Sequence, residues 1–332
     1  MDAFQFSFRA ICPILLLILL GYVMRKIGSW DDKFYARLNS LCFHLFLPVQ
    51  VFCNIYTIGD LASMNWPLLG FLVICNGCAV VLGFICARLF VPDRRRKGCM
   101  IQAAFRSNQA VLGIPLAESL GGAAAVAFAS LASAFFVPAY NVIAVLVLTY
   151  YGAEQERPSV GKLLRRVIRN PLVISALLGV AVVLIRQFLP QENGELVFSI
   201  KNQLPSIYKL LTDCGKVAAP LMLFALGARL NFSSIRDMVA PLVLGVSLRI
   251  AIVPGVCVAL AVLLRETLHI TAIETPTILA ICASPIAVSS AVMTQEIGGD
   301  EQLANQQVVW SSVLSMFTIF VFVFILRSIG ML

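Results

Sequence analysis

Apolar residues occur along this chain in long, nearly uninterrupted runs, not in the short alternations of a soluble fold. A run of about 20 mostly apolar residues is long enough to cross a bilayer as one α-helix. The pattern predicts an all-α polytopic membrane protein with ten transmembrane helices. The predicted spans are Phe8–Met24, Leu38–Tyr56, Pro67–Val91, Gly98–Leu120, Ala123–Tyr151, Pro171–Pro190, Ser206–Leu230, Ala240–Leu264, Thr275–Gln295 and Leu303–Leu326.

The fourth predicted span contains residues that a regular membrane helix avoids. The stretch FRSNQAVLGIPL places Arg106, Asn108, Gly113 and Pro115 within an apolar run. The ninth span has a comparable stretch, in which Pro285 lies among small and hydroxyl-bearing residues. A membrane tolerates a broken backbone only where protein or an aqueous cavity satisfies the freed N–H and C=O groups. Two broken helices therefore predict a binding pocket or pathway, as in transporters.

Landmarks in the first half of the chain recur in the same order in the second half. The run Pro13–Gly21, which ends in LeuLeuGly, has a counterpart of equal length at Pro171–Gly179, and a GlyGly pair follows each broken span. Five spans per copy is an odd number, so the second copy enters the membrane from the opposite side. We expect two inverted five-helix repeats, at 1–151 and 171–332, joined by a short basic cytoplasmic linker at 152–170.

Composition supports the membrane assignment and suggests an orientation. Hydrophobic residues make up 60% of the chain and charged residues 13%, with a mean hydropathy of +0.91, so no soluble fold would bury this apolar surface. The formal net charge of +8 does not indicate nucleic acid, because most basic residues fall in alternate loops, such as RRRK at 94–97. By the positive-inside rule these loops are cytoplasmic. We expect a multi-pass protein of the cell membrane, with both termini extracytoplasmic.

The broken helices have a chemistry that suits a small anion. Proline removes one helix hydrogen bond, glycine permits a turn, and the Asn108 amide supplies both a donor and an acceptor. Half-helix N-termini beyond the break present unpaired N–H groups and a positive dipole, which favour a carboxylate. The alternative is a packed proline kink. The matched break at Pro285 favours the binding site, to which Gly113 and Pro115 would also belong.

Arg106 and Arg249 fall within predicted spans and not in loops. At about 1.5 Å per residue, each lies near the middle of a hydrocarbon core about 30 Å thick. A charge at that depth costs on the order of 2.5–3.5 kcal/mol unless it is paired or hydrated. We expect at least one of them to neutralise an anionic substrate. The alternative is a structural arginine that donates to helix carbonyls or to an internal acid.

Four ionisable residues are candidates for coupling transport to a proton or sodium gradient. Asp213 and Lys216 lie one turn apart in the seventh span, and His44 lies in the second. The Asp–Lys pair could instead neutralise itself, and the histidine could be a satisfied core residue. Glu118 flanks the first broken segment and could equally lie at the membrane surface. The acidic pair at 300–301 is expected in a solvated loop.

Motifs of membrane enzymes and ATP-driven pumps are absent from this sequence. It has two histidines and no HExxH, GxxxxGK[ST] or GxGxxG, so we expect neither catalysis nor a cofactor. The ten cysteines lie in apolar runs without a framework spacing, which implies packing and neither a disulfide nor a metal. Transport would then draw on ion or substrate gradients. A channel or a transporter-like nutrient sensor is the alternative.

Three stretches resemble the auxin efflux carrier family of secondary transporters, and the likeness spans nearly the whole chain. They are SNQAVLGIPL from Ser107, PLMLFALGARL from Pro220, and AlaSerPro at 283–285 followed by IGGD at 297–300. The resemblance implies two inverted five-helix repeats similar to the bile-acid sodium symporter fold. It also implies that the fourth and ninth spans cross at mid-membrane beside the substrate. Plant relatives move auxin, and bacterial relatives are linked to dicarboxylates such as malate and malonate.

The linker between the repeats is short, as in the compact prokaryotic branch of the family. This resemblance disfavours auxin as the substrate. Ser289 stands where many relatives carry asparagine. It is a candidate ligand, but the resemblance does not imply a matched pair of asparagine ligands in this chain. The resemblance implies alternating-access transport of a small organic anion, with a homodimer as a possible assembly. The first two spans of each repeat would form one body, and the remaining spans a second body that carries the crossing.

Overall fold

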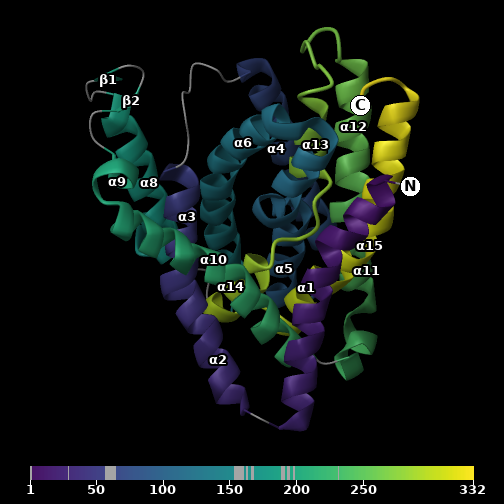
Figure 1. Cartoon of the computed structure of the whole chain (residues 1–332). Helices are drawn as coiled ribbons and strands as arrows, with labels where there is room; N and C mark the ends of the chain where they lie inside the picture. Colours follow the sequence, from purple (N-terminus) through teal and green to yellow (C-terminus); the bar gives the residue numbers. More distant parts are fainter. Residues whose placement is uncertain are drawn as a thin grey trace.

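The computed structural model is almost entirely helical (Figure 1). It describes residues 2–332 except 29, 57–64, 153–160, 162–163, 166–167, 188–190, 193–194, 197–198 and 231, so the predicted linker lies largely outside the described residues. The α-helices are α1 (Asp2–Ile27), α2 (Asp32–Leu41), α3 (Leu47–Tyr56), α4 (Trp66–Phe90), α5 (Arg94–Phe105), α6 (Ile114–Tyr151), α8 (Pro171–Gln187), α9 (Ile200–Gln203), α10 (Pro205–Ala228), α11 (Val239–Ser247), α12 (Val253–Leu263), α13 (Thr275–Cys282), α14 (Ser289–Ile297) and α15 (Glu301–Ser328). The shorter elements are the π-helical turns η1 (Cys42–Phe46), η3 (Gln109–Gly113) and η5 (Leu248–Ile252), the 3₁₀ segment η4 (Phe232–Met238), and the paired strands β1 (Gln191–Glu192) and β2 (Glu195–Leu196).

Six helical stretches among the described residues are long and apolar enough to cross a membrane. They are Asp32–Tyr56, Trp66–Phe90, Ala124–Tyr151, Pro205–Ala228, Ile235–Leu263 and Glu301–Ser328. α8 is a shorter apolar helix, and α5, α13 and α14 are pieces of interrupted helices. These stretches confirm an all-α, multi-pass membrane fold.

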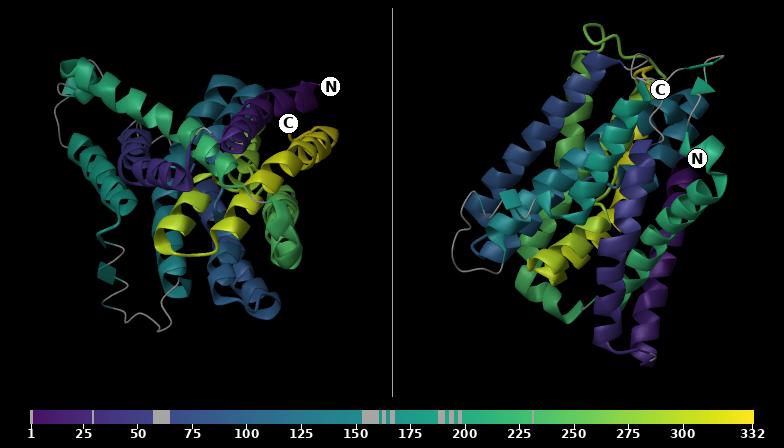
Figure 2. Two further views of the ribbon diagram at one scale, coloured as in Figure 1. Left: turned by 90° about the horizontal axis from the view of Figure 1, so that it is seen from below. Right: turned by 90° about the vertical axis from the view of Figure 1, so that its left-hand side faces the viewer.

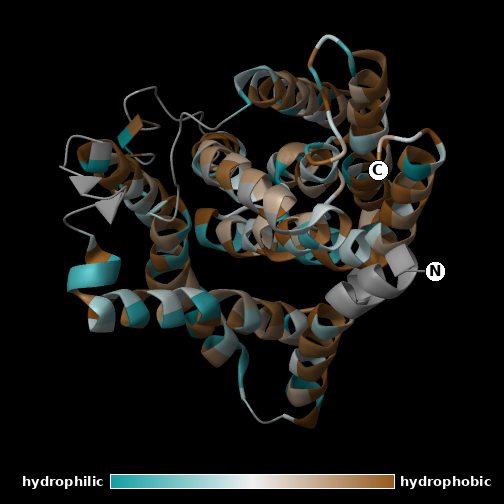
Figure 3. Cartoon of the chain, turned by 45° about the horizontal axis from the view of Figure 1, so that its top comes forward, coloured by the Kyte–Doolittle hydropathy of each residue, from teal (hydrophilic) through white to brown (hydrophobic). Residues whose placement is uncertain are grey.

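Large apolar side chains are exposed on many helices of the bundle, and the ribbon in Figure 3 is coloured hydrophobic over much of its length. Leu16, Ile74, Leu89 and Leu263 are each more than half exposed. Soluble proteins rarely expose apolar surface on this scale, whereas lipid covers it without cost. The right-hand view of Figure 2 shows most long helices running in roughly one direction, with both chain ends toward the same end of the molecule.

Helices far apart in the sequence pack closely against one another. α1 packs along α10, and α3 packs along α8. A glycine permits each approach: a Cβ on Gly21 of α1 would clash with the Phe224 carbonyl of α10, and one on Gly179 of α8 would lie 2.9 Å from the Ile55 Cβ of α3. Small residues that bring backbones together are a usual basis of helix association in membranes.

Two interrupted helices meet in the interior. One consists of α5, η3 and the first part of α6, and the other of α13 and α14. Their non-helical segments run antiparallel: the Asn108 N–H donates to the Pro285 carbonyl oxygen (2.8 Å), and the Ala287 N–H donates to the Arg106 carbonyl oxygen (3.1 Å). These bonds satisfy backbone groups that a hydrocarbon environment would leave unpaired. We call this contact the crossing.

The first interruption lies earlier in the chain than the sequence indicated. Residues 106–108 leave the helix, whereas Gly113 is helical (φ −69°, ψ −45°) and Pro115 lies within the helix that η3 and α6 form, after its first turn. The prediction that these two residues break the helix is therefore wrong. Gly113 serves close packing, because a Cβ there would clash with the Ala280 carbonyl of α13. Gly122 (φ 63°) divides α6 where the fourth and fifth predicted spans meet.

Ion pairs tie several helices together at one end of the bundle. Arg96 donates to the Asp300 carboxylate (2.9 Å) and to the Asp237 carbonyl oxygen (2.7 Å). Arg229, after the last residue of α10, pairs with Glu301 of α15 at 2.5 and 2.7 Å. The expectation that both acidic residues lie in a solvated loop is wrong, because their side chains are only 20% and 18% exposed.

Candidate functional site

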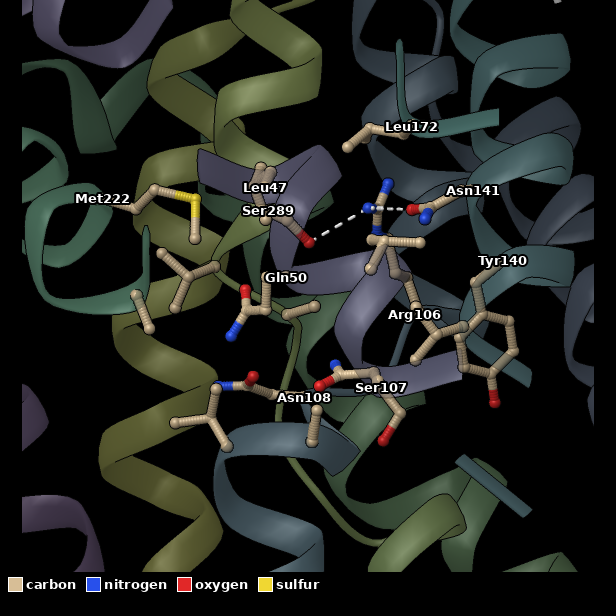
Figure 4. Close-up of a pocket in the computed structure, with 18 residues that line it drawn as sticks. Leu47, Gln50, Arg106, Ser107, Asn108, Tyr140, Asn141, Leu172, Met222 and Ser289 are labelled. Carbon is tan, nitrogen blue, oxygen red and sulfur yellow. Dashed lines mark hydrogen bonds between the residues drawn. The ribbon is translucent and has the colours of Figure 1, made fainter. Parts of the chain in front are cut away.

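A cavity lies beside the crossing (Figure 4). Side chains from α3, α8 and α10 line it, together with side chains from η3, α6, α14 and the non-helical segments. Its volume is about 640 Å³ including its open mouth.

Arg106 places a positive charge in the cavity wall, although its side chain is nearly buried. Its guanidinium donates to Asn141 Oδ1 (2.8 Å), to Ser289 Oγ (3.0 Å) and to Gln102 Oε1 (3.3 Å), and it contacts the Met293 sulfur. All four partners are neutral, and no carboxylate of the described residues pairs with it. A buried charge without a counter-ion is costly, so this site favours an anion.

Further donors in the wall have no partner within the described part of the chain. The Nδ2 atoms of Asn108 and Asn141 and the hydroxyl of Ser107 are buried and make no hydrogen bond there. All three residues line the cavity. Leaving a buried polar group unsatisfied costs about 1–3 kcal/mol. A ligand rich in acceptors would remove this cost.

α3 presents one face to the cavity, formed by residues at helical spacing. Leu47, Gln50, Val51 and Asn54 lie at positions i, i+3, i+4 and i+7 and all line it. Figure 4 shows the Gln50 side chain across the cavity from the Arg106 guanidinium. The face therefore combines an apolar surface with two amides.

Two helix N-termini also point toward the cavity. The helix that starts with η3 begins next to Asn108, and α14 begins at Ser289, and both residues line the cavity. The first N–H groups of a helix have no partner within it, and the dipole makes this end positive. Both features favour an anion in the cavity that Arg106 also lines.

The candidate residues from the sequence divide into lining and supporting positions. Arg106, Asn108 and Ser289 line the cavity, and none of the other candidates does. Pro285 supports the site through its carbonyl, which accepts from Asn108, and Gly113 supports it through its contact with α13. Pro115, at the start of α6, lies outside the lining.

Arg249 lies behind the crossing and away from the cavity lining. Its side chain is fully buried and donates to the carbonyl oxygens of Ser284 (2.8 Å), Ile281 (2.9 Å) and Phe105 (3.4 Å). Phe105 and Ile281 lie in the last turns of α5 and α13, and Ser284 follows α13. A cation at helix C-termini is favourable, which matches the structural alternative for this arginine.

The four coupling candidates lie outside the cavity lining. Asp213 pairs with Lys209 (3.0 Å), not with Lys216, and all three are exposed. His44 is exposed and contacts the carbonyl one turn earlier (2.9 Å), so it is not a core histidine. Glu118 is exposed. Among the described residues no group of three His, Cys, Asp or Glu side chains is placed to hold a metal ion.

Sequence reasoning missed several lining residues. Gln50, Asn54, Tyr140, Asn141 and Met222 line the cavity. The two amides of α3 carry a readable signal, because polar residues one turn apart inside an apolar span usually face protein or water. Asn141 carries the same signal in the fifth span. Met222 carries none, since an apolar residue in an apolar helix can face either lipid or ligand.

Three relatives cover nearly the full chain at low identity. An uncharacterized transporter of Methanothermobacter thermautotrophicus is 23% identical over 320 residues, which are 94% of this chain and 96% of the relative. An uncharacterized transporter of Methanocaldococcus jannaschii is 24% identical over 292 residues, 86% of each chain. A protein of Rhizobium meliloti named "Putative malonate transporter" is 24% identical over 325 residues, 96% of this chain and 95% of the relative.

A family-wide comparison agrees with these relatives. The family described as "Membrane transport protein" matches residues 6–323, nearly the entire chain. The match confirms the resemblance to the auxin efflux carriers. A transport family, a multi-pass helical fold and an interior crossing beside a cavity are mutually consistent. The chain belongs to the membrane transport protein family.

Proposed function

We propose that this protein is a secondary active transporter of a small organic anion, a dicarboxylate or other carboxylate similar to malonate or malate. The observation that carries the proposal is Arg106, a nearly buried cation in the cavity wall whose partners are all neutral. The unpartnered amide donors of Asn108 and Asn141 add to it. The name of the Rhizobium relative supports a carboxylate as the anion.

Transport would proceed by alternating access between two bodies of helices. In this proposal residues 1–151 and 171–332 form inverted repeats of five helices each, joined by the linker 152–170. Gly21 and Gly179, which match in the two repeats, each lie at a close crossing with the second span of the other repeat, and this supports the arrangement. Spans assigned to the first body (α3, α8 and α10) and spans assigned to the second both line the cavity.

The orientation follows from the basic residues. The arginines that begin α5 and the one that follows α10 gather at one end of the bundle, where they pair with the residues around Asp300. By the positive-inside rule this end is cytoplasmic, so both termini would face outward in a cell membrane. In this proposal the protein's partners are membrane lipid and the anion, and nucleic acid is not a partner.

Energy would come from a gradient, with a proton or sodium ion as the coupling ion and no bound cofactor. Asp213, Lys216, His44 and Glu118 are exposed, so a coupling role for them would act from outside the cavity. Asp213→Asn tests it: a transport rate that no longer varies with pH, beside a wild type that does, would assign proton coupling to that carboxylate.

Counterflow of labelled malonate into proteoliposomes loaded with unlabelled malonate tests the proposed function. Arg106→Gln removes the charge and keeps most of the volume. We expect it to lower malonate affinity and exchange by about 10- to 100-fold, because hydrogen bonds to a charged group contribute about 1.5–3 kcal/mol. Arg88→Gln, which removes an exposed charge near the end of α4, is the matched control and should exchange at the wild-type rate.

Two results would contradict the proposal. One is wild-type exchange by an Arg106→Gln variant that inserts normally; the other is thermal stabilisation by neutral or cationic solutes but by no carboxylate. Counterflow also separates a carrier from a channel, because a channel does not accumulate label against its own gradient.

A further inference from the structure

The cavity has two chemically different ends. At one end Arg106 supplies a charge, with Ser289 and Asn141 around it. At the other end α3 supplies the amide of Gln50. Among the described lining residues Arg106 is the single permanently charged side chain. The α3 end has hydrogen-bonding capacity without charge.

Arg249 does not change this asymmetry. Its guanidinium faces the carbonyls of Phe105, Ile281 and Ser284 on the far side of the crossing. Its field favours an anion in the cavity generally, and it offers no donor to the α3 end. A second negative charge at that end would therefore meet the amide of Gln50 without a cation.

We propose that the site binds its substrate as a monoanion, with one ionised carboxylate at Arg106 and an uncharged hydrogen-bonding group at Gln50. This inference rests on the proposed function, because it assumes that a carboxylate binds at Arg106. Gln50 is then the specificity-determining residue, since its amide can donate to a carbonyl and accept from a hydroxyl or an amide N–H.

The physical basis is the cost of bringing a second charge out of water. A carboxylate in a partly buried site without a cation favours its protonated form. A dicarboxylate would therefore enter as its singly protonated form. Its apparent affinity would fall about tenfold for each pH unit above its second pKa, as that form becomes scarce. A half-amide of the same shape carries one permanent negative charge and would bind independently of pH in this range.

Isothermal titration calorimetry on the purified protein, at pH 6 and pH 8, tests this with malonate, its half-amide malonamate, and neutral malonamide. We expect malonamate to bind about equally at both pH values. At pH 8 it should bind at least about tenfold more tightly than malonate. Malonamide should not bind, because it has no carboxylate for Arg106.

Two substitutions at position 50 test the residue itself. Gln50→Lys places a cation at the uncharged end and should reverse the preference, so that malonate exceeds malonamate at pH 8. Gln50→Met keeps the size of the side chain and should weaken malonamate about three- to tenfold, the effect of one lost neutral hydrogen bond. Asn202→Lys, at an exposed position on α9, adds the same charge outside the cavity and should leave the preference as in the wild type.

Failure of the inference is distinguishable from failure of the proposed function. If wild-type protein binds malonate more tightly than malonamate at pH 8, or if both Gln50 variants keep the wild-type ratio, the monoanion site is wrong while the anion transporter stands. If neither carboxylate binds, or if Arg106→Gln binds them as the wild type does, both are wrong.

Discussion

Two buried arginines differ in what surrounds them, and this separates their roles at the scale of single residues. Arg106 is held by neutral side chains and lines the cavity. Arg249 is held by backbone carbonyls at the C-terminal ends of two interrupted helices. The first arrangement leaves a charge to be neutralised by a ligand, whereas the second uses the charge to cap helices. The same residue type thus serves binding in one place and stability in the other.

Replacing Arg249 by methionine should destabilise the protein without changing which anions bind. Arg249→Met leaves three buried carbonyl groups without their donor, which we expect to cost on the order of 2–3 kcal/mol of unfolding free energy. Thermal unfolding in detergent measures the loss, and calorimetry on the folded protein at low temperature measures malonate affinity. A variant of wild-type stability that no longer binds malonate would instead place Arg249 in the substrate site.

At the scale of secondary structure, the crossing gathers four helix ends. α5 and α13 end there with their carbonyls turned to Arg249, while η3 and α14 begin there with their N-termini at the cavity. The polarity of the interrupted helices therefore separates a cation site from an anion site. Close packing of η3 on α13 maintains the arrangement, and it depends on Gly113.

A methyl group at position 113 should disturb the crossing. In Gly113→Ala the added Cβ would overlap the Ala280 carbonyl, so η3 and α13 must separate. We expect a loss of about 1–3 kcal/mol in unfolding free energy, together with weaker malonate binding. Gly77→Ala, at a helical position in α4 with open space around it, is the control. It should be neutral or stabilising, because alanine is the better helix former by about 1 kcal/mol. Equal stability of the two variants would contradict this account of Gly113.

At the scale of the whole molecule, the basic end of the bundle is held together by contacts between helices assigned to different bodies. Arg229 of the α10 end pairs with Glu301 of α15, and Asn39 of α2 donates to Gln295 of α14. Gln302 also donates to the Arg229 carbonyl oxygen (3.3 Å). Under alternating access, these contacts would have to separate when this end opens.

The Arg229–Glu301 pair should therefore affect transport rate more than affinity. In a double-mutant cycle of Arg229→Gln and Glu301→Gln we expect a coupling energy of about 1–2 kcal/mol, because the pair is bidentate and largely shielded from water. Thermal unfolding gives the coupling energy, and counterflow gives the exchange rate, which should change while malonate affinity stays within about twofold. Strictly additive effects of the two substitutions would contradict a direct pair.

Several features of the fold and site could be predicted from the sequence because the signals are local. The position of each apolar run follows from hydropathy, and Arg106, Asn108 and Ser289 stand out within the broken spans. Gln50 and Asn141 were missed because their importance depends on which helix faces meet. The sequence alone predicts Glu301 in a loop, because its partner, Arg229, lies 72 residues away.

The sequence by itself determined that the chain is an all-α membrane protein with two interrupted helices, because apolar length, proline, glycine and buried polar residues act within a few turns of the chain. The tertiary structure alone decided where the first helix breaks, which arginine reaches the cavity and which amides face it. Those outcomes depend on contacts between segments far apart in the chain, such as the bonds between Asn108 and Pro285 and between Arg249 and Phe105. Burial and hydrogen bonding at these contacts set the energy of each side chain, and no local pattern encodes them.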